Sequence, residues 1–192
     1  MNIDSTLLHL LNGLAGRSVV FDLIIRLLVN DYAITTALVT VPFGLWFSGA
    51  TGRQRARNQR AALSAIASMF VANVFVKALN LVYYRPRPFA SRDLNLLFYH
   101  PSDSSFPSNP TSVGFCIATA VWLYNRAAGW VLYALATLLG MARLISGVHY
   151  PSDILGGALI GTLCAYLVVR KLTFLDRLWS AIMRQMRRLL LA

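Results

Sequence analysis

Three residues in the C-terminal half of the chain have types and a spacing that suit phosphate chemistry. Arg143, His149 and Asp153 lie in the segment ARLISGVHYPSDILGG, directly after the hydrophobic run 129–142. An aspartate beside a histidine keeps one ring nitrogen protonated and leaves the other free to attack or to take a proton. A guanidinium group presents a fork of donors that fits a phosphate oxyanion. An arginine at membrane depth is costly, which indicates that Arg143 has a functional role.

A second group of basic residues lies upstream, in the segment YYRPRPFASRDLNLLFYHPSDSSFPSNPTS (83–112). Its prolines exclude a continuous helix, and its polar residues exclude a membrane span. Arg85 and Arg87 alternate with two prolines that fix the backbone, so the pattern predicts a rigid cationic pair that clamps a phosphate. The alternative is that these arginines only meet lipid headgroups.

The end of this segment predicts the start of a helix. In SSFPSNPTS, Ser108 or Asn109 can cap the helix, and Pro110 suits its first turn. A helix N-terminus offers unpaired N–H groups and positive potential to an anion, so capping and phosphate binding are compatible here. The hydroxyl group of Ser108 is a further donor.

The elements that must position these residues are membrane helices. The chain has 192 residues, of which 57% are hydrophobic and 13% are charged, and its mean hydropathy is +0.57. These values exclude an ordinary soluble domain and indicate a small polytopic membrane protein. Apolar stretches that approach the roughly 20 residues of a spanning helix lie at 31–50, 61–83, 110–125, 127–147 and 154–170. A sixth candidate at 6–29 is broken by NGLAG and either spans the membrane or lies along its interface.

The distribution of arginines predicts the orientation of these spans. The loop TGRQRARNQR, Arg126 and the C-terminal tail are basic and therefore face the cytoplasm. Segments 84–109 and 148–153 then face the other side, so we expect an all-α bundle of five to six spans with an extracytoplasmic active-site loop. That loop carries Arg85, Arg87 and Arg92 against the positive-inside rule, which indicates a ligand. The net charge of +11 does not indicate a nucleic-acid partner, because basic residues commonly lie beside anionic lipid in membrane proteins.

The two cysteines are predicted to be buried free thiols, because Cys116 and Cys164 fall inside apolar spans. No metal-ligand spacing is present in the sequence.

The stretch 175–192 combines apolar residues with arginines, as a helix lying on an anionic leaflet does. A helix that binds a partner protein is the alternative for this stretch. No removable signal peptide is expected.

The motifs RPRP, PSN and R-x5-H-x3-D, in this order, resemble those of the type 2 phosphatidic acid phosphatase superfamily. VYYRPRPF, HPSDSSFPSNPTS and SGVHYPSDILGG are most similar to bacterial undecaprenyl-diphosphate phosphatases of the bacitracin-resistance type. The resemblance covers about residues 31–170. It implies a phosphatase-like transmembrane domain (31–171) between an N-terminal amphipathic or first membrane segment (1–30) and a basic cytoplasmic tail (172–192). The resemblance also implies that the protein is located in the bacterial inner membrane, with its active site facing the periplasm or the cell exterior.

The resemblance further implies a role for each site residue. His149 is the nucleophile that forms a phosphohistidine, and Asp153 orients it. Arg143, Arg87 and Ser108 hold the phosphate, with Asn109 and Arg85 as additional phosphate-binding candidates. No metal or other cofactor is implied, because arginines do the work of a cation. The expected partners are a polyprenyl or other lipid phosphate or diphosphate and membrane lipid, and the oligomeric state is left open.

Two positions depart from the family pattern. The family has a lysine seven residues before the arginine that matches Arg87, where this chain has Asn80; Lys77 lies one helical turn earlier and is an auxiliary candidate. The second family motif ends in a histidine, the general acid for the leaving group, and this chain has Pro110 there. Proline cannot transfer a proton. His100 is the other histidine of the loop and is the candidate substitute.

The loss of the general acid favours one substrate class over another. General acid catalysis is typically worth about a hundred- to ten-thousand-fold, and most of that is needed when an alkoxide departs. A lipid phosphate that departs from a diphosphate is already a stable anion, so a lipid diphosphate phosphatase is our first hypothesis. A family member that binds or translocates a lipid phosphate is the alternative favoured by Pro110. A third alternative, an accessory subunit of a membrane complex, leaves the outward-facing arginines unexplained.

Overall fold

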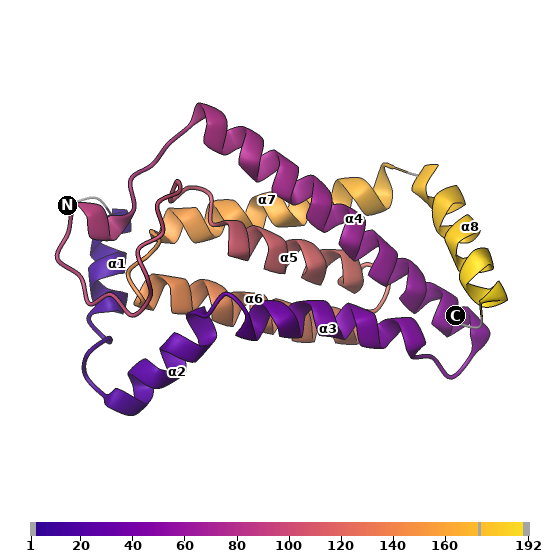
Figure 1. Ribbon diagram of the computed structural model, residues 1–192, viewed down its shortest axis with the longest axis horizontal. Helices are drawn as coiled ribbons and strands as arrows, with labels where there is room; N and C mark the ends of the chain where they lie inside the picture. Colours follow the sequence, from indigo (N-terminus) through magenta and orange to yellow (C-terminus); the bar gives the residue numbers. More distant parts are fainter. Residues whose placement is uncertain (1–2, 173, 190–192) are drawn as a thin grey trace.

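The computed structural model describes residues 3–172 and 174–189, and this part of the chain is helical without strands. Its helices, shown in Figure 1, are α1 (Ile3–Asn12), α2 (Val19–Val29), α3 (Ala33–Phe47), α4 (Gly52–Val82), the short 3-10 helix η1 (Pro88–Ala90), α5 (Asn109–Trp122), α6 (Arg126–Ile145), α7 (Pro151–Arg170) and α8 (Phe174–Arg188). The predicted all-α helix bundle is confirmed. Residues 83–108, between α4 and α5, form one long loop that we call the site loop.

Helix α5 forms the centre of the bundle. It packs against α4, α6 and α7, and its buried residues include Cys116, Ala118 and Val121. The hydrophobic core therefore surrounds α5, with contributions such as Leu132 from α6 and Ala165 from α7. Both cysteines of the chain, predicted to be free thiols, are free and buried in this structure.

Two glycines allow α7 to approach α5 closely. Gly157 and Gly161 lie one turn apart, and a Cβ atom at Gly157 would be 2.6 Å from the carbonyl oxygen of Ser108. A Cβ atom at Gly161 would overlap the carbonyl oxygen of Ser112. Small residues at this spacing are typical of close helix contacts in membranes. The approach brings the first turns of both helices together, where the backbone N–H of Ser108 donates to the carbonyl of Asp153 at 3.0 Å.

Fewer helices meet the length and composition of a membrane span than the five to six expected from sequence. Among residues 3–172 and 174–189, three helices do so, namely α4, α6 and α7, and α2 with α3 makes a fourth if this pair, bent by 49°, is one span. The difference arises partly at α5, which has 14 residues. At 1.5 Å per residue it is about 21 Å long, less than the roughly 30 Å of a hydrocarbon core.

The N-terminal segment 6–29 is not a single helix. It is divided between α1 and α2, and the connecting turn contains Gly16 with a φ of +82°. The side chain of Asn12 donates to the carbonyl oxygens of Asn95 and Ile145, at 2.9 and 2.8 Å. Helix α1 therefore packs against the site loop and the end of α6.

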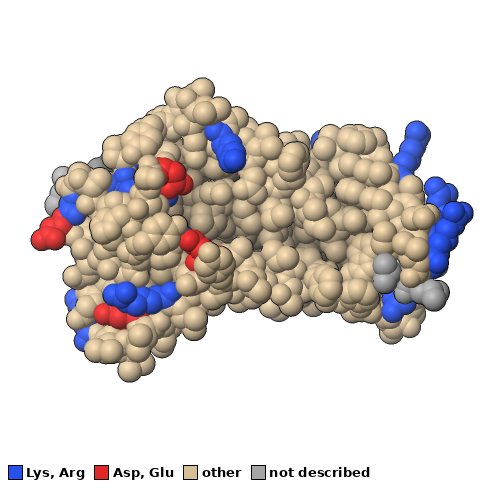
Figure 2. Space-filling view, viewed as in Figure 1, with Lys and Arg blue, Asp and Glu red and all other residues tan. Residues whose placement is uncertain are grey.

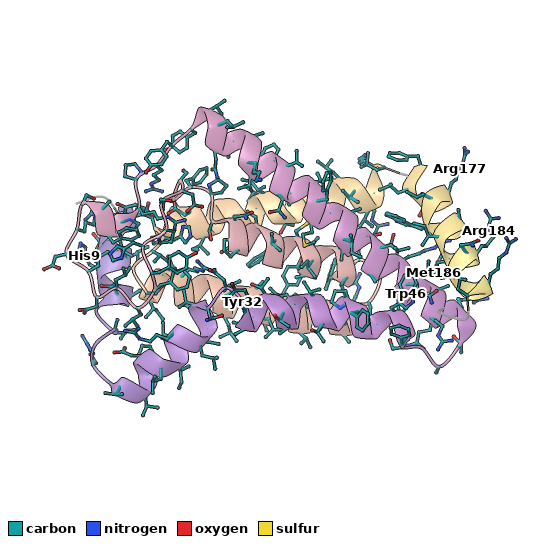
Figure 3. The ribbon with its side chains drawn as sticks, viewed as in Figure 1. His9, Tyr32, Trp46, Arg177, Arg184 and Met186 are labelled. Carbon is teal, nitrogen blue, oxygen red and sulfur yellow. The ribbon has the colours of Figure 1, made fainter. Side chains whose placement is uncertain are left out.

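The two ends of the bundle differ in charge. Aspartates and basic residues are mixed at the end formed by α1, α2 and the site loop, whereas the visible charges at the other end are basic (Figure 2). That basic end includes α8, on which Trp179 and Met183 are buried while Arg177 and Arg184 are exposed (Figure 3). The predicted amphipathic helix is thus present over 174–188, and residues 190–192 of the predicted stretch lie outside the described residues.

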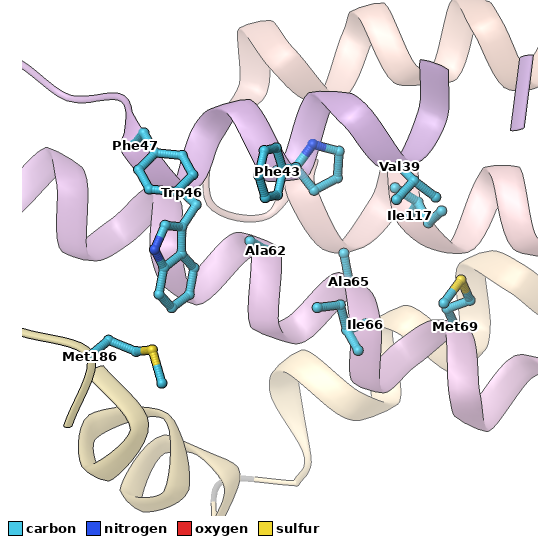
Figure 4. Close-up of a pocket in the computed structure, with 11 residues that line it drawn as sticks. Val39, Phe43, Trp46, Phe47, Ala62, Ala65, Ile66, Met69, Ile117 and Met186 are labelled. Carbon is cyan, nitrogen blue, oxygen red and sulfur yellow. The ribbon is translucent and has the colours of Figure 1, made fainter. Parts of the chain in front are cut away.

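An apolar cavity of about 300 Å³ lies between α3, α4 and α8 (Figure 4). Phe43 and Trp46 from α3, Ile66 and Met69 from α4, and Met186 from α8 line it. None of its lining residues is ionisable, and two of them, Trp46 and Met186, lie toward the end of the bundle opposite the site loop (Figure 3).

Candidate active site

The candidate active site lies where the site loop packs against residues 146–150, which connect α6 to α7. Arg87 comes from the site loop, Arg143 from the last turn of α6, His149 from the connection and Asp153 from the first turn of α7. All four are buried, and His149 retains only 1% of its exposure. Buried ionisable groups of this kind require internal partners.

Both ring nitrogens of His149 have defined neighbours. Nδ1 lies 2.9 Å from the carbonyl oxygen of Ser105, which can only accept, so Nδ1 carries the proton. Nε2 therefore carries the lone pair, and it accepts a hydrogen bond from Nη1 of Arg87 at 3.2 Å. Burial lowers the pKa of His149, which favours the neutral form of the ring. The ring is therefore held with its unprotonated nitrogen facing an arginine.

Asp153 is fixed by several donors. Its Oδ2 accepts hydrogen bonds from the hydroxyl of Ser105 and, at 2.7 Å, from the backbone N–H of Tyr150. Its Oδ1 accepts from Nη1 of Arg85 at 2.6 Å. The carboxylate lies 3.6 Å from Nδ1 of His149, an ion-pair distance. It can stabilise positive charge on the imidazole, while the Ser105 carbonyl sets the ring orientation.

Arg85 and Arg87 pair with different aspartates. Its guanidinium group lies between Asp4 and Asp153, at 2.7 and 2.6 Å, and over the ring of Tyr150. Pro86, between the two arginines, favours a backbone with three residues per turn, in which side chains two positions apart point in different directions. Arg85 therefore supports Asp153 and joins α1 to α7, and its phosphate contact stays a prediction.

The other two arginines are each paired with an aspartate from a loop. Nη2 of Arg87 donates to Asp103 at 2.7 Å, and Nη2 of Arg143 donates to Asp31 at 2.6 Å. The arginine side chains are 6% and 4% exposed, whereas the aspartates are 63% and 40% exposed. Phe98 covers the guanidinium group of Arg143 at 4.7 Å.

The first turn of α5 borders this cluster. The helix begins at Asn109 with Ser108 as its N-cap and Pro110 in the first turn, as the motif predicts. The hydroxyl of Ser108 lies 3.0 Å from that of Thr111 and does not cap the backbone. The side-chain oxygen of Asn109 is buried, and within the described part of the chain it has no hydrogen-bond partner.

Three other residues singled out from the sequence lie outside the cluster. Lys77 is exposed on α4 and makes no hydrogen bond or ion pair within residues 3–172 and 174–189. His100 is exposed and packs edge-on against Phe89, with ring centroids 5.0 Å apart. Arg92 lies against α1, where its Nη1 is 3.3 Å from Nε2 of His9. This arginine therefore contacts a residue of the same chain at the place where the sequence predicts a ligand.

No sequence pattern marks Ser105, Asp31 or Asp103 as site residues. Ser105 acts through its backbone carbonyl, which bonds His149, and through its hydroxyl, which donates to Asp153. Asp31 is 112 residues from Arg143 and belongs to no motif. Asp103 lies in the polar run before PSN, where nothing distinguishes it from its neighbours. Over the described residues, no group of three or more His, Cys, Asp or Glu side chains has the arrangement of a metal site.

Comparison with known proteins adds independent information. Residues 61–177 match the PAP2 superfamily, and this range contains all three motifs. The chain is 31% identical over 160 residues to the undecaprenyl-diphosphatase BcrC of Bacillus subtilis (strain 168), covering 83% of this chain and 79% of that protein. The crystal structure of Aquifex aeolicus LpxE has a TM-score of 0.67 at 28% identity, covering 88% of this chain and 96% of that one. A transmembrane PAP2 type phosphatidylglycerolphosphate phosphatase from Bacillus subtilis has a TM-score of 0.59 at 22% identity, covering 88% and 85%, a likeness of fold.

Proposed function

Because this chain belongs to the PAP2 superfamily, we propose that it is an integral-membrane phosphatase that hydrolyses a polyprenyl diphosphate through a phosphohistidine on His149. The observation that carries the proposal is the placement of His149. Its Nδ1–H is bound to a carbonyl at 2.9 Å, and its free Nε2 faces a buried arginine at 3.2 Å. A nucleophile beside a fixed cation is the arrangement that phosphoryl transfer needs.

In the first step, the Nε2 lone pair attacks the terminal phosphorus in line. The bond between that phosphorus and the bridging oxygen breaks, and its electron pair leaves with the lipid monophosphate. Arg87 and Arg143 donate hydrogen bonds to the equatorial oxygens. The Asp153 carboxylate, 3.6 Å from Nδ1, stabilises the positive charge that the ring acquires.

In the second step, water attacks the phosphorus of the phosphohistidine. The phosphorus–Nε2 bond breaks, inorganic phosphate leaves with the water oxygen, and Nε2 regains its lone pair. One proton of the water passes to the phosphate or the solvent. The Nδ1 proton stays on the ring, bonded to the Ser105 carbonyl, in both steps. The net reaction converts a lipid diphosphate and water into a lipid monophosphate and inorganic phosphate.

The position of Pro110 supports a diphosphate substrate. It lies in the first turn of α5, where the family motif ends in a histidine that protonates the leaving group. A lipid monophosphate that leaves as an anion needs little protonation, whereas an alkoxide needs a proton. His100, the candidate substitute, packs against Phe89 instead.

Pro110 also supports a second candidate function. A family member that has lost its general acid can keep the arginines and bind or translocate a lipid phosphate without cleaving it. Both functions use the same anion site, so turnover distinguishes them.

We further propose that the site loop faces the periplasm or the cell exterior, in the bacterial inner membrane. The basic end of the bundle, with the first turns of α4 and with α8, then faces the cytoplasm, in agreement with the positive-inside rule. A lipid carrier released on the outer face would be the substrate that reaches this site.

The direct test is phosphate release by the purified protein from a polyprenyl diphosphate and from the corresponding monophosphate. We expect release from the diphosphate, and loss of it in His149→Ala. His9→Ala is the matched control, because His9 lies against Arg92 outside the cluster, and it should keep activity. Binding of either lipid without release by the wild-type protein would favour the lipid-phosphate binder.

A further inference from the structure

Two aspartates occupy the donors that a phosphate would need. Asp103 accepts from Arg87, whose other terminal nitrogen faces His149, and Asp31 accepts from Arg143. Resting on the proposed function of this site, we propose that Asp31 and Asp103 are internal competitors of the substrate phosphate and thereby set its affinity.

The arginine donors show why competition is required. A phosphoryl group on Nε2 of His149 would lie next to Nη1 of Arg87, which is 3.2 Å from that nitrogen and also donates to the carbonyl oxygen of Val148. The other terminal nitrogen of Arg87, Nη2, donates to Asp103 at 2.7 Å. In Arg143, Nη2 donates to Asp31, while the buried Nε has no partner within the described residues. A phosphate therefore gains the terminal donor Nη2 of each arginine only when the paired aspartate withdraws.

The exposure of the partners indicates which of them moves. The arginine side chains are held in the interior, whereas the two carboxylates are on the solvent side and can turn into water without burying a charge. Asp153 differs, because it is fully buried and bonded to Ser105, Tyr150 and Arg85. It is a fixed part of the site.

Contacts around Asp31 join it to the site loop. The hydroxyl of Tyr99 donates to Asp31 at 3.0 Å, and the neighbouring Phe98 lies over Arg143. Asp31 belongs to the turn between α2 and α3, and Asp103 belongs to the site loop. The two carboxylates therefore sit on chain segments that touch each other and cover the arginines together.

An internal competitor lowers the apparent affinity of every ligand by the same factor, because it reduces the fraction of protein in which the arginines are available. An ion pair with a partly exposed partner contributes only a modest free energy. We therefore expect each aspartate to weaken the apparent affinity for phosphate by about 3- to 10-fold. The same competition would help inorganic phosphate to leave after each turnover.

The test is calorimetric titration of the full-length protein in detergent with inorganic phosphate and inorganic pyrophosphate. Asp31→Asn and Asp103→Asn should each tighten binding of both ligands by the same factor, about 3- to 10-fold. Asp93→Asn is the matched control, because Asp93 is an exposed residue of the same loop that makes no hydrogen bond or ion pair within the described chain. It should leave both affinities unchanged.

Other outcomes overturn the proposal in distinguishable ways. If the substitutions acted only by making the electrostatic potential of the site more positive, binding of pyrophosphate would tighten more than binding of phosphate. The same effect would then appear in Asp93→Asn, and this result would overturn the proposal. Binding that is lost in Arg87→Gln but unchanged in Asp31→Asn and Asp103→Asn would overturn the competition alone. Phosphate binding that is absent in all variants, or unaffected by Arg87→Gln, would overturn the proposed function together with the competition.

Discussion

The reactivity of the candidate site depends on the protonation of one residue, His149. A neutral ring with its proton on Nδ1 can attack through Nε2, and a protonated ring cannot. The hydrogen bond to the Ser105 carbonyl fixes the tautomer, and burial disfavours the charged ring. The fold therefore holds the proposed nucleophile in its neutral form before any substrate binds.

This leads to a prediction for the pH dependence. Because the pKa of His149 is lowered from its ordinary value of 6.5, the ring stays neutral as the pH falls through 6.5. The acid limb of kcat/KM, which reports groups of the free enzyme, should lie below pH 6.5. The unfolded chain binds this proton more readily, so acid also weakens folding below 6.5. An acid limb above 6.5 would contradict a neutral, buried nucleophile.

A second prediction concerns Pro110. Pro110→His should raise hydrolysis of a lipid monophosphate about ten-fold or more, and it should raise diphosphate hydrolysis much less, because a general acid helps most when an alcohol departs. The change should cost little stability, since the backbone N–H in a first helical turn has no helical partner. Initial rates on both lipids measure the effect. Equal inertness toward both lipids in a folded variant would favour the lipid-phosphate binder.

For individual residues, the sequence predicts which side chains form the site better than it predicts the groups to which they bond. Arg87, Arg143, His149 and Asp153 meet as their motifs indicate. Arg85 is the exception, because two acidic residues from distant parts of the chain attract it away from Arg87. Ser105 contributes a carbonyl group, whose direction depends on the path of the loop and on no side-chain pattern.

At the scale of helices, the contact between α5 and α7 positions the site. Glycines bring the two backbones together, and the first turns of the helices then share a hydrogen bond between Ser108 and Asp153. A widening of this contact would move Asp153 away from His149 without changing either residue. The spacing of small residues on α7 is therefore part of the site.

Gly161→Ala tests this contact. The added Cβ would overlap the backbone of Ser112, so we expect a loss of about 1–3 kcal/mol in stability, typical of overpacking. Gly44→Ala on α3 is the control, because a Cβ atom there meets nothing within 4 Å and alanine favours a helix by about 0.5–1 kcal/mol. Thermal unfolding in detergent compares the two. Equal melting temperatures would show that α5 and α7 do not depend on this approach.

The boundaries of helices were predictable where apolar runs have clear ends. The runs 127–147 and 154–170 correspond closely to α6 and α7. Helix α4 begins at Gly52, nine residues before the predicted run at 61, because an arginine-rich stretch is polar yet helical. Hydropathy marks the apolar part of a helix and not its solvated first turns. The segment 6–29 is divided because Gly16 adopts a positive φ that favours a turn.

At the scale of the whole molecule, charge separates the two ends. The chain has seven acidic residues, and four of them, Asp4, Asp31, Asp103 and Asp153, pair with arginines at the site end. The arginines of α8 and of the first turns of α4 gather at the other end. The site arginines are thus compensated internally, whereas the basic end is available to anionic lipid.

The proposed orientation in the membrane can be tested by cysteine labelling. In a variant without Cys116 and Cys164, a cysteine introduced as Asp93→Cys should react with a membrane-impermeant maleimide on intact cells. A cysteine introduced as Gln54→Cys, exposed at the basic end, should react only after permeabilisation. The reverse pattern would place the site loop in the cytoplasm.

The proposed mechanism requires that His149 becomes phosphorylated during cleavage of a lipid diphosphate. The most direct measurement is rapid quenching of the purified protein with a polyprenyl diphosphate radiolabelled in its terminal phosphate, followed by peptide mapping. We expect acid-labile, base-stable label on the peptide that contains His149, formed no more slowly than phosphate is released, and absent in His149→Ala. Phosphate release without label on His149, or label on another residue, would contradict it.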